Sequence, residues 1–435
     1  MRVAIIGVGH VGLVHGATLA TIGHDVVGVD DDLGKIEQLQ LGRTPFYEPG
    51  LDDLVQNAVS AGRLRFSADP TDAIVDSEVA FICVGTPGRP TGEPNLTAVE
   101  RAAETVGRLA TREMVVAEKS TVPVQTAERI RTVLQKASDH QFHVACNPEF
   151  LREGRAVEDS LRPMRVLVGA NTPWGHAVMR RLYEPLLSAD VSYFATDLRT
   201  AELAKHACNA FLALKISFAN ALARICEASE ADVVDVVDIM GSDERIGRDF
   251  LDAGLGYGGS CFPKDIAAFR AQVSRIGYEF PLLDEIVKIN HEAVEAIFKK
   301  IEHSLWNLEG KRVCLLGLAF KPGTDDVREA PALRLAQRLI DAGATVIGYD
   351  PKANANAVVQ VPELQVADDL YTAAEGADCI VICTEWPEFA KLDLTRLKGI
   401  LAHPTIVDGR NALDPQVMAD AGFTYLPTGR PPVNS

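Results

Sequence analysis

The chain has 435 residues, of which 47% are apolar and 24% charged, and this length predicts two to four globular domains. Its formal net charge of −17 argues against a protein that wraps nucleic acid or lies on an anionic membrane. There is no secretory signal or bilayer-spanning apolar run, and the eight cysteines form no Cys-x-x-Cys pair. We therefore expect a cytoplasmic protein with reduced thiols and no metal site.

The first thirty residues carry the pattern of a dinucleotide-binding turn. A short apolar run over residues 3–6 precedes the sequence GVGHVG, in which Gly7, Gly9 and Gly12 have the G-x-G-x-x-G spacing. A second β-type run ends in Asp30, 18 positions beyond Gly12. The glycines permit a tight turn, close approach to a pyrophosphate and helix packing, and the carboxylate accepts ribose hydroxyls. Because Asp30 would repel a 2′-phosphate, we expect NAD rather than NADP.

Two more buried strands are predicted over residues 79–84 and 114–117. The first is broken by Gly85 and Thr86, and the second stops just before Ser120 and Thr121. In open α/β sheets, ligands bind beyond the carboxyl ends of the strands, so these hydroxyls are candidates for a site. The alternative, that Ser120 and Thr121 cap a helix, is equally open.

A strand over residues 143–146 leads into the sequence NPEFLREG. Its carboxylates, Glu149 and Glu153, are four residues apart and would share one face of a helix at another strand end. The alternative is a solvated turn in which Arg152 forms salt bridges.

Residues 200–227 contain no glycine or proline and are mostly apolar or alanine, which predicts a long and largely buried helix. Lys205 and Asn209 lie within about 40° of each other around such a helix, and Asn220 lies about 20° further round. Buried polar groups need partners, and oxygen atoms of a substrate are one kind of partner. Hydrogen bonds to neighbouring helices are the other.

The sequence GLGYGGSCFPKD over residues 254–265 places one thiol, Cys261, behind four glycines. Glycine lets the backbone approach a ligand closely, so the loop can hold the sulfur against a substrate. Lys264 is a cation that would favour the thiolate, and Asp265 is a carboxylate that could move a proton. The alternative is a flexible surface loop with an inert cysteine.

The strand-then-glycine pattern returns at residues 311–317, and a following strand ends in Asp350. This copy lacks G-x-G-x-x-G, so we expect a Rossmann-like sheet that binds no dinucleotide. Lys321, Arg328 and Arg410 offer the cations that a nucleotide diphosphate requires, although they could be ordinary surface charges. The predicted fold is α/β, with two Rossmann-like parallel-sheet domains (1–198 and 301–435) joined by a long central helix and a small helical domain (199–300).

Together these motifs resemble the UDP-glucose/GDP-mannose dehydrogenase family, and within it the UDP-glucose 6-dehydrogenase branch. GVGHVGL, FICVGTP, EKSTVP, NPEFLREG, the central helix, GYGGSCFPKD and GLAFKPGTDD stand in the family's order over nearly the whole chain. The resemblance implies oxidation of the C6 alcohol of UDP-glucose to a carboxylate by two hydride transfers to NAD, through a thioester on Cys261. It further implies a homodimer with a shared active site, in which Arg245 reaches the substrate of the partner subunit.

The resemblance also implies roles for individual residues. The catalytic set is Cys261, Asp265, Lys205, Asn209, Glu149 and Thr121. The cofactor set is Gly7, Gly9, His10, Val11, Gly12, Asp30, Lys35, Gly85, Thr86, Ser120, Thr121, Glu153, Lys264 and Arg328. The substrate set is Glu149, Phe150, Leu151, Arg152, Lys205, Asn209, Arg245, Phe250, Leu251, Tyr257, Gly258, Phe262, Phe320, Lys321 and Arg410.

The chain departs from the family's usual sequence at two places. Family members usually have Tyr at the position of His10, and commonly Pro-Asp-Arg where this chain has Pro-Met-Arg at 163–165. Neither departure touches the catalytic set, so only the choice of nucleotide sugar is affected. The same chemistry on GDP-mannose or a UDP-N-acetylhexosamine is one alternative, and an NAD-binding redox sensor without turnover is another.

Overall fold

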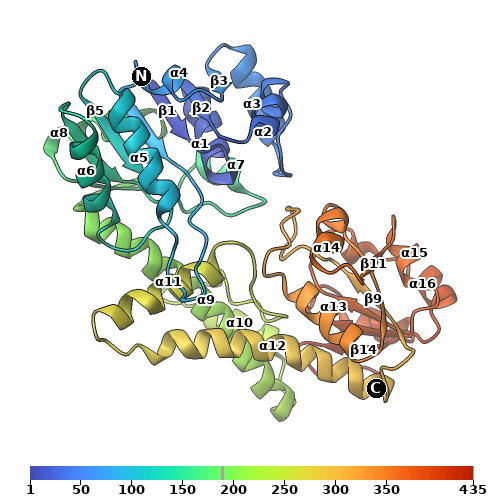
Figure 1. Cartoon of the computed structure of the whole chain (residues 1–435). Coiled ribbons are helices and arrows are strands. Elements are labelled where there is room, and N and C mark those ends of the chain that lie inside the picture. The colour runs from blue at the N-terminus through green and yellow to red at the C-terminus, as the bar shows by residue number, and fades with distance from the viewer. Residues whose placement is uncertain (188–190, 435) are drawn as a thin grey trace. The chain divides into compact units, whose positions relative to one another are not determined.

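The computed structural model describes residues 1–187 and 191–434 and divides into two compact units, coloured along the chain in Figure 1. The first unit comprises residues 1–208 and 264–279, and the second comprises residues 209–263 and 280–435. The chain passes from one unit to the other within helix α9 (Leu198–Ser229) and again within helix α11 (Phe262–Arg275).

The first unit is built on an eight-stranded sheet in the order β3-β2-β1-β4-β5-β6-β7-β8. All neighbouring strands are parallel except β6 and β7, which pair antiparallel. The first six follow the order of a dinucleotide-binding sheet, as the sequence predicts. The strands are β1 (Arg2–Ile6), β2 (Asp25–Val29), β3 (Leu64–Ser67), β4 (Val79–Ile82), β5 (Met114–Glu118), β6 (Phe142–Cys146), β7 (Arg165–Ala170) and β8 (Ser192–Thr196).

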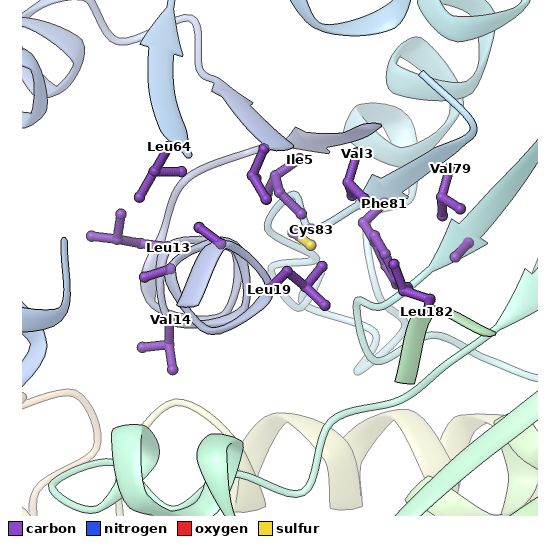
Figure 2. Packing of buried hydrophobic residues seen from close by; sticks show 14 of the residues in the cluster. Val3, Ile5, Leu13, Val14, Leu19, Leu64, Val79, Phe81, Cys83 and Leu182 are labelled. Atoms are coloured by element: carbon purple, nitrogen blue, oxygen red, sulfur yellow. The ribbon is translucent and has the colours of Figure 1, made fainter. Parts of the chain in front are cut away.

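Helices cover both faces of this sheet because its central strands are apolar on both sides. On one face, Leu13 and Leu19 of α1 pack with Ile5 and Phe81 of the sheet, as Figure 2 shows. The helices are α1 (His10–Thr21), α2 (Leu33–Gln40), α3 (Leu51–Ser60), α4 (Thr71–Ile74), α5 (Thr97–Leu109), α6 (Thr126–Ala137), α7 (Ala156–Leu161) and α8 (Pro173–Tyr183), with a 3₁₀ turn at Glu184–Leu186.

The second unit contains a six-stranded, fully parallel sheet in the order β11-β10-β9-β12-β13-β14. This order repeats that of the first six strands of the other sheet, which confirms the predicted duplication. The strands are β9 (Arg312–Leu316), β10 (Thr345–Tyr349), β11 (Gln365–Val366), β12 (Cys379–Ile382), β13 (Thr405–Asp408) and β14 (Thr424–Pro427). The helices are α10 (Val233–Gly241), α12 (Pro281–Leu305), α13 (Pro331–Asp341), α14 (Asn354–Gln360), α15 (Leu370–Ala374), α16 (Leu394–Ile400) and α17 (Pro415–Asp420), with a 3₁₀ turn at Phe389–Lys391.

The carboxylate that ends the second strand has different partners in the two sheets. Asp30, after β2, accepts a hydrogen bond from the Val8 N–H and pairs with the ammonium of Lys35. Asp350, after β10, is buried and accepts from two main-chain N–H groups of the glycine turn and from the indole of Trp386. In the second sheet the carboxylate therefore stabilises its own turn.

Helix α9 confirms the long helix predicted from the sequence, but it is less buried than expected. Lys205, Asn209 and Asn220 are all buried. Phe211 and Phe218 are exposed, as is Ile225 one further heptad along. The spacing of seven residues places these three apolar side chains within about 40° of one another. Composition alone could not show that one side of so apolar a helix is left uncovered.

No described helix has both the length and the apolar character that a bilayer-spanning segment requires.

Candidate active site

The glycine turn after β1 has the shape that a bound pyrophosphate requires. A Cβ atom at Gly12 would lie 1.9 Å from the main-chain oxygen of Gly7, so only glycine fits the first turn of α1. Gly7 has a φ of +93°, which glycine adopts without strain. Nothing lies within 4 Å of a Cβ built at Gly9, so this side of the turn is open. The turn and Asp30 therefore fit the diphosphate and ribose of a dinucleotide.

The hydroxyl groups predicted near the cofactor join the ends of β4 and β5. Ser120 donates to the main-chain oxygen of Val84 at 2.7 Å, and Thr86 donates to the main-chain oxygen of Thr121 at 3.0 Å. Helix α6 begins only at Thr126, and its N-cap residue is Gln125. Interpreting Ser120 and Thr121 as helix caps is therefore wrong.

The sequence NPEFLREG forms a loop rather than a helix, so the expectation that Glu149 and Glu153 share a helix face is wrong. Helix α7 starts only at Ala156. Pro148 disfavours helical backbone at the residue before it, and Gly154 has a φ of +81°. The Glu149 carboxylate accepts the N–H of Leu151 two residues on, a local bond that competes with a helix.

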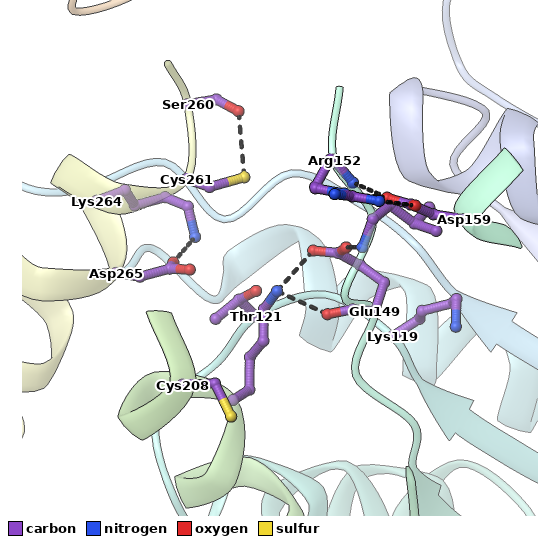
Figure 3. A network of polar contacts seen from close by, with 12 residues as sticks. Lys119, Thr121, Glu149, Arg152, Asp159, Cys208, Ser260, Cys261, Lys264 and Asp265 are labelled. Carbon is purple, nitrogen blue, oxygen red and sulfur yellow. Dashed lines mark hydrogen bonds and ion pairs between the residues drawn. The ribbon is translucent and has the colours of Figure 1, made fainter. Parts of the chain in front are cut away.

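Arg152, in the same loop, pairs with Asp159 on α7. Its guanidinium and its main-chain N–H both bind that carboxylate, as Figure 3 shows for the side chains. Its salt-bridging role, which the sequence left as an alternative, is therefore present. The pair fixes the end of the loop to the helix that follows it.

Lys205 of α9 and Glu149 form a buried ion pair. The ammonium donates to the carboxylate at 2.9 Å and to the main-chain oxygen of Glu149 at 2.6 Å. Burial alone would raise the pKa of Glu149, but the charge of Lys205 and hydrogen bonds from Lys205 and Leu151 lower it below its usual value. Glu149 is therefore a carboxylate with a neighbouring cation, an arrangement suited to holding a polar oxygen.

A second buried polar network lies beside this pair, and the sequence did not single it out. Lys119 donates to the side-chain and main-chain oxygens of Asn147, and the Tyr183 hydroxyl also donates to the Asn147 side chain. Burial lowers the pKa of Lys119 to about 8. The signal available was the charged residue within the apolar strand end AEKST, since a buried lysine requires partners.

Asp265 lies in the first turn of α11, in the first unit, and is almost fully buried. The ammonium of Lys264 donates to its carboxylate at 2.7 Å (Figure 3). The cation that the sequence assigned to the thiol is thus paired with the carboxylate beside it. Cys261 directly precedes α11 and belongs to the second unit, as does Asn209. Its sulfur lies 3.6 Å from the Ser260 hydroxyl.

The loop before Cys261 is clamped on several sides within the second unit, so it is not a flexible surface loop. Asn220 accepts the N–H of Gly254, and Asn290 of α12 bonds both the N–H and the oxygen of Tyr257. The N–H of Gly259 donates to the oxygen of Arg328 at 2.8 Å. The Asn220 amide therefore has a protein partner, but this partner is the loop rather than a neighbouring helix as the alternative expected.

Several residues of the predicted substrate set gather around this loop. Phe262 packs against both Tyr257 and Phe250, the latter with a φ of +66°. A Cβ at Gly259 would meet the ring of Phe320 at 2.8 Å, and Arg410 donates to the oxygens of Cys383 and Gly256.

Two other residues of the predicted substrate set have contacts of their own. Arg245 has an exposed guanidinium that pairs with Asp243 in its own turn. The ammonium of Lys321 lies 5.3 Å from the centre of the Phe320 ring.

Comparison with known proteins identifies the family to which the chain belongs. Three models of the UDP-glucose/GDP-mannose dehydrogenase family match the chain: the NAD binding domain at residues 1–187, the central domain at 199–292 and the UDP binding domain at 314–415. The chain belongs to this family. It is an NAD-dependent dehydrogenase, and the glycine turn and Asp30 lie within the part of the chain that matches the family's NAD binding domain.

Curated relatives over nearly the full length of the chain are named UDP-glucose 6-dehydrogenase. The proteins of Rhizobium meliloti (strain 1021) and Bacillus subtilis (strain 168, TuaD) are 44% and 43% identical to this chain. The matches cover 99% of this chain and 100% and 94% of the relatives.

Solved structures show the same fold. The UDP-glucose dehydrogenase of Pyrobaculum islandicum is 35% identical, with a TM-score of 0.91 and coverage of 99% and 98%. The UDP-D-ManNAc dehydrogenase of Pyrococcus horikoshii is 28% identical, with a TM-score of 0.86 and coverage of 99% of each chain.

Proposed function

We propose that the chain oxidises the C6 alcohol of UDP-glucose to the carboxylate of UDP-glucuronate. One alcohol, two NAD⁺ and one water give one carboxylate, two NADH and three protons. The observation that carries this substrate is the identity of 43–44%, over nearly the full length, with two relatives named for it. The structure named for a UDP-N-acetylated sugar is more distant, at 28% identity.

The thiol distinguishes this reaction from a simple alcohol dehydrogenation. Loss of a proton and a hydride from the alcohol gives an aldehyde, which Cys261 captures by forming a carbon–sulfur bond. Loss of a second hydride from this thiohemiacetal leaves a thioester, and water then breaks the carbon–sulfur bond to release the acid and the thiol. Bound NAD supplies the hydride acceptor. We assign proton transfer to Asp265 and the positioning of water to Thr121 and Glu149.

Lys205 and Asn209 are proposed to stabilise the oxygen at the reacting carbon. An alkoxide and a thiohemiacetal oxygen both carry negative charge, and a buried ammonium stabilises such charge more strongly than one in water. Lys205 is buried and already oriented by Glu149, so little reorganisation is needed when the charge develops. The remaining residues of the predicted cofactor and substrate sets keep their assigned roles within this proposal.

The stoichiometry tests the thiol directly. We expect two NADH for each UDP-glucose consumed by the wild type. Cys261→Ala should bind both ligands but lose turnover, and Cys261→Ser should stall as a covalent ester that intact mass spectrometry detects, because an ester hydrolyses less readily than a thioester. One NADH per sugar, or full turnover by Cys261→Ala, would contradict the mechanism. Faster turnover of GDP-mannose or a UDP-N-acetylhexosamine would contradict the substrate.

We further propose that two chains form a homodimer with a shared active site. The exposed apolar face of α9, formed by Phe211, Phe218 and Ile225, supports a protein interface because contiguous exposed apolar surface marks such sites. Arg245 is exposed on the same unit and free of the thiol loop, so it is suited to reach a substrate in the partner subunit.

Complementation tests this arrangement. Arg245→Ala and Cys261→Ala subunits, each inactive alone, should regain part of the activity when mixed, because hybrid dimers contain one intact site. A chain that stays monomeric by light scattering, or mixed dimers that exchange without regaining activity, would contradict a shared site.

Two further assignments belong to the same proposal. The NAD domain would span 1–198, the dimerisation domain with the thiol loop 199–300, and the UDP-sugar domain 301–435. We place the reaction in the cytoplasm, whose reducing conditions suit the eight free cysteines, Cys261 among them.

A further inference from the structure

Glu48 is a buried carboxylate to which the proposed reaction gives no role. It lies between α2 and α3, and its side chain is 0% exposed. Burying a carboxylate is unfavourable unless it is paired and hydrogen-bonded, so the partners of Glu48 indicate which parts of the chain it holds together.

The partners of Glu48 come from two distant parts of the chain. One carboxylate oxygen lies 2.9 Å from Nε2 of His10 and accepts the N–H of Gly154 at 2.8 Å. The other oxygen accepts the N–H of Ala156 at 2.8 Å. One carboxylate therefore connects residues 38 and 106 to 108 positions away.

His10 is the partner of Glu48 that lies in the predicted cofactor-binding turn. It is the first residue of α1 and follows Gly9, whose surroundings are open. Its ring also packs against Phe46, with the ring centres 4.8 Å apart, so it is held from two sides. His10 therefore directly follows the open side of the turn at which we propose that the pyrophosphate binds.

Gly154 and Ala156 stand at the end of the loop that carries the catalytic candidates. The loop starts at Asn147, which Lys119 holds, and Glu149 pairs with Lys205 further along. The segment forms no helix before Ala156, and Glu48 accepts two N–H groups at its end, those of Gly154 and of the first residue of α7.

We propose that Glu48 is a positioning residue that couples dinucleotide binding at the glycine turn to the order of the loop of residues 147–155. NAD restrains His10, His10 restrains the Glu48 carboxylate, and the carboxylate holds the N–H groups of Gly154 and Ala156. The inference rests on the proposed position of the pyrophosphate at Gly7–Gly12. It gives His10, where the family usually has Tyr, a function specific to a ring nitrogen that can meet a carboxylate.

Hydrogen exchange of the full-length protein with NAD alone tests this coupling. In the wild type, saturating NAD should slow exchange of the Gly154 and Ala156 amides at least about fivefold, because a hydrogen-bonded amide exchanges only when its bond opens. Glu48→Gln, which leaves one acceptor oxygen in place of two, should lose most of this protection and bind NAD about tenfold more weakly. His10→Phe keeps the ring and both N–H bonds to Glu48, and should also lose the NAD-dependent protection.

Glu113→Gln is the matched control, because Glu113 forms another carboxylate–histidine pair, at 2.7 Å from His143. This variant should keep wild-type NAD affinity and NAD-dependent protection. If Glu48→Gln does not fold, His10→Phe decides the result.

A wild type that binds NAD without slower exchange at Gly154 and Ala156, or a His10→Phe variant with full protection, would overturn the coupling. Failure of the wild type to bind NAD in calorimetry would instead contradict the cofactor site itself. A separate kinetic readout is the KM for NAD, which His10→Phe should raise about tenfold while the Kd for UDP-glucose changes by less than about twofold.

Discussion

Lys205 holds both the side chain and the main chain of Glu149, through one ammonium that donates to Oε1 and to the carbonyl oxygen. Both side chains are almost fully buried, so neither charge can turn to solvent when the other is removed. Breaking a buried pair by removing one partner is strongly destabilising, by about 3–5 kcal/mol. The pair thus links the stability of the first unit to its chemistry.

Lys205→Met should therefore lower the free energy of unfolding by about 3 kcal/mol and abolish NADH formation. Lys205→Met with Glu149→Gln removes both charges and should recover most of the stability while activity stays absent. Urea unfolding and NADH absorbance measure the two effects separately. Recovery of activity in the double variant would show that the pair serves the fold alone.

Glu202 predicts a pH dependence of stability. Burial raises its pKa from 4.5 to about 7, although its carboxylate accepts the N–H groups of Gln125 and Ala127 at the start of α6. Its folded pKa is raised, so the folded state binds more protons than the unfolded state between these values. Stability should then fall as pH rises from about 4.5 to 7, by about 3 kcal/mol at most.

The Glu202→Gln variant should lose this slope, since an amide does not titrate in this range. It should also be less stable below pH 4.5, because Gln offers one acceptor oxygen to the two N–H groups. Urea titrations at half-unit pH steps measure the difference, and parallel curves for variant and wild type would contradict the raised pKa.

Cofactor selectivity should depend on the pair formed by Asp30 and Lys35. The Lys35 ammonium lies 2.9 Å from the Asp30 carboxylate. In Asp30→Ala the repulsion of a 2′-phosphate is gone and the ammonium loses its partner. We expect kcat/KM for NADP to rise at least about tenfold, which is about 1.4 kcal/mol, while that for NAD falls.

The double variant Asp30→Ala with Lys35→Ala is the control for this prediction. It should lose the gain with NADP, because no cation is left to meet the phosphate. Initial rates with each cofactor are the measurement. An equal NADP rate in the single and double variants would leave Lys35 without a role.

The glycine loop before Cys261 should not tolerate a side chain at Gly258. A Cβ there would lie 2.4 Å from the main-chain oxygen of Glu329, and backbone cannot move away cheaply. Gly258→Ala should reduce kcat at least about a hundredfold, because a misplacement of about 1 Å at a reacting group costs this much. NAD binding should persist.

Gly399→Ala on α16 is the control, since nothing lies within 4 Å of a Cβ there. It should keep full activity and gain about 0.5–1 kcal/mol of stability, as expected for alanine in place of glycine inside a helix. A Gly258→Ala enzyme with wild-type kcat would show that the loop does not position the thiol.

The elements that depend on local pattern could be predicted from the sequence. The strand before Gly7, the strand that ends at Asp30 and the long helix around Lys205 all lie where the apolar runs indicate. The conformation of the segment from Glu149 to Glu153 could not be predicted in this way. It depends on Pro148, on the bond from the Leu151 N–H to the Glu149 carboxylate, and on Glu48, more than a hundred residues earlier, which accepts the N–H groups of Gly154 and Ala156 just beyond the segment.

The same limit applies to the candidate site, where local patterns could be predicted from the sequence and long-range partners could not. Glycines, the thiol and the charged residues at strand ends identify the chemistry, since each stands in a recognisable pattern. For the network of Lys119, Asn147 and Tyr183, the strand end AEKST indicates only that the lysine needs partners, because those partners come from separate elements. The partners of Asn220 and Lys264 were likewise not predictable, since a spacing shows which face a side chain occupies but not what stands opposite it.

The two Asp residues that follow β2 and β10 occupy matching positions in two similar sheets but have different partners. At Asp350 the turn bends back onto the carboxylate, and Trp386 adds its indole N–H. The carboxylate oxygen that a ribose hydroxyl would need as an acceptor is thereby already hydrogen-bonded within the protein. Substitution of Asp30 should thus change the preference between NAD and NADP, whereas substitution of Asp350 should destabilise the fold of its domain. Two aspartates at matching positions thus differ in role: Asp30 is proposed to select the cofactor, whereas Asp350 stabilises the fold of its own sheet.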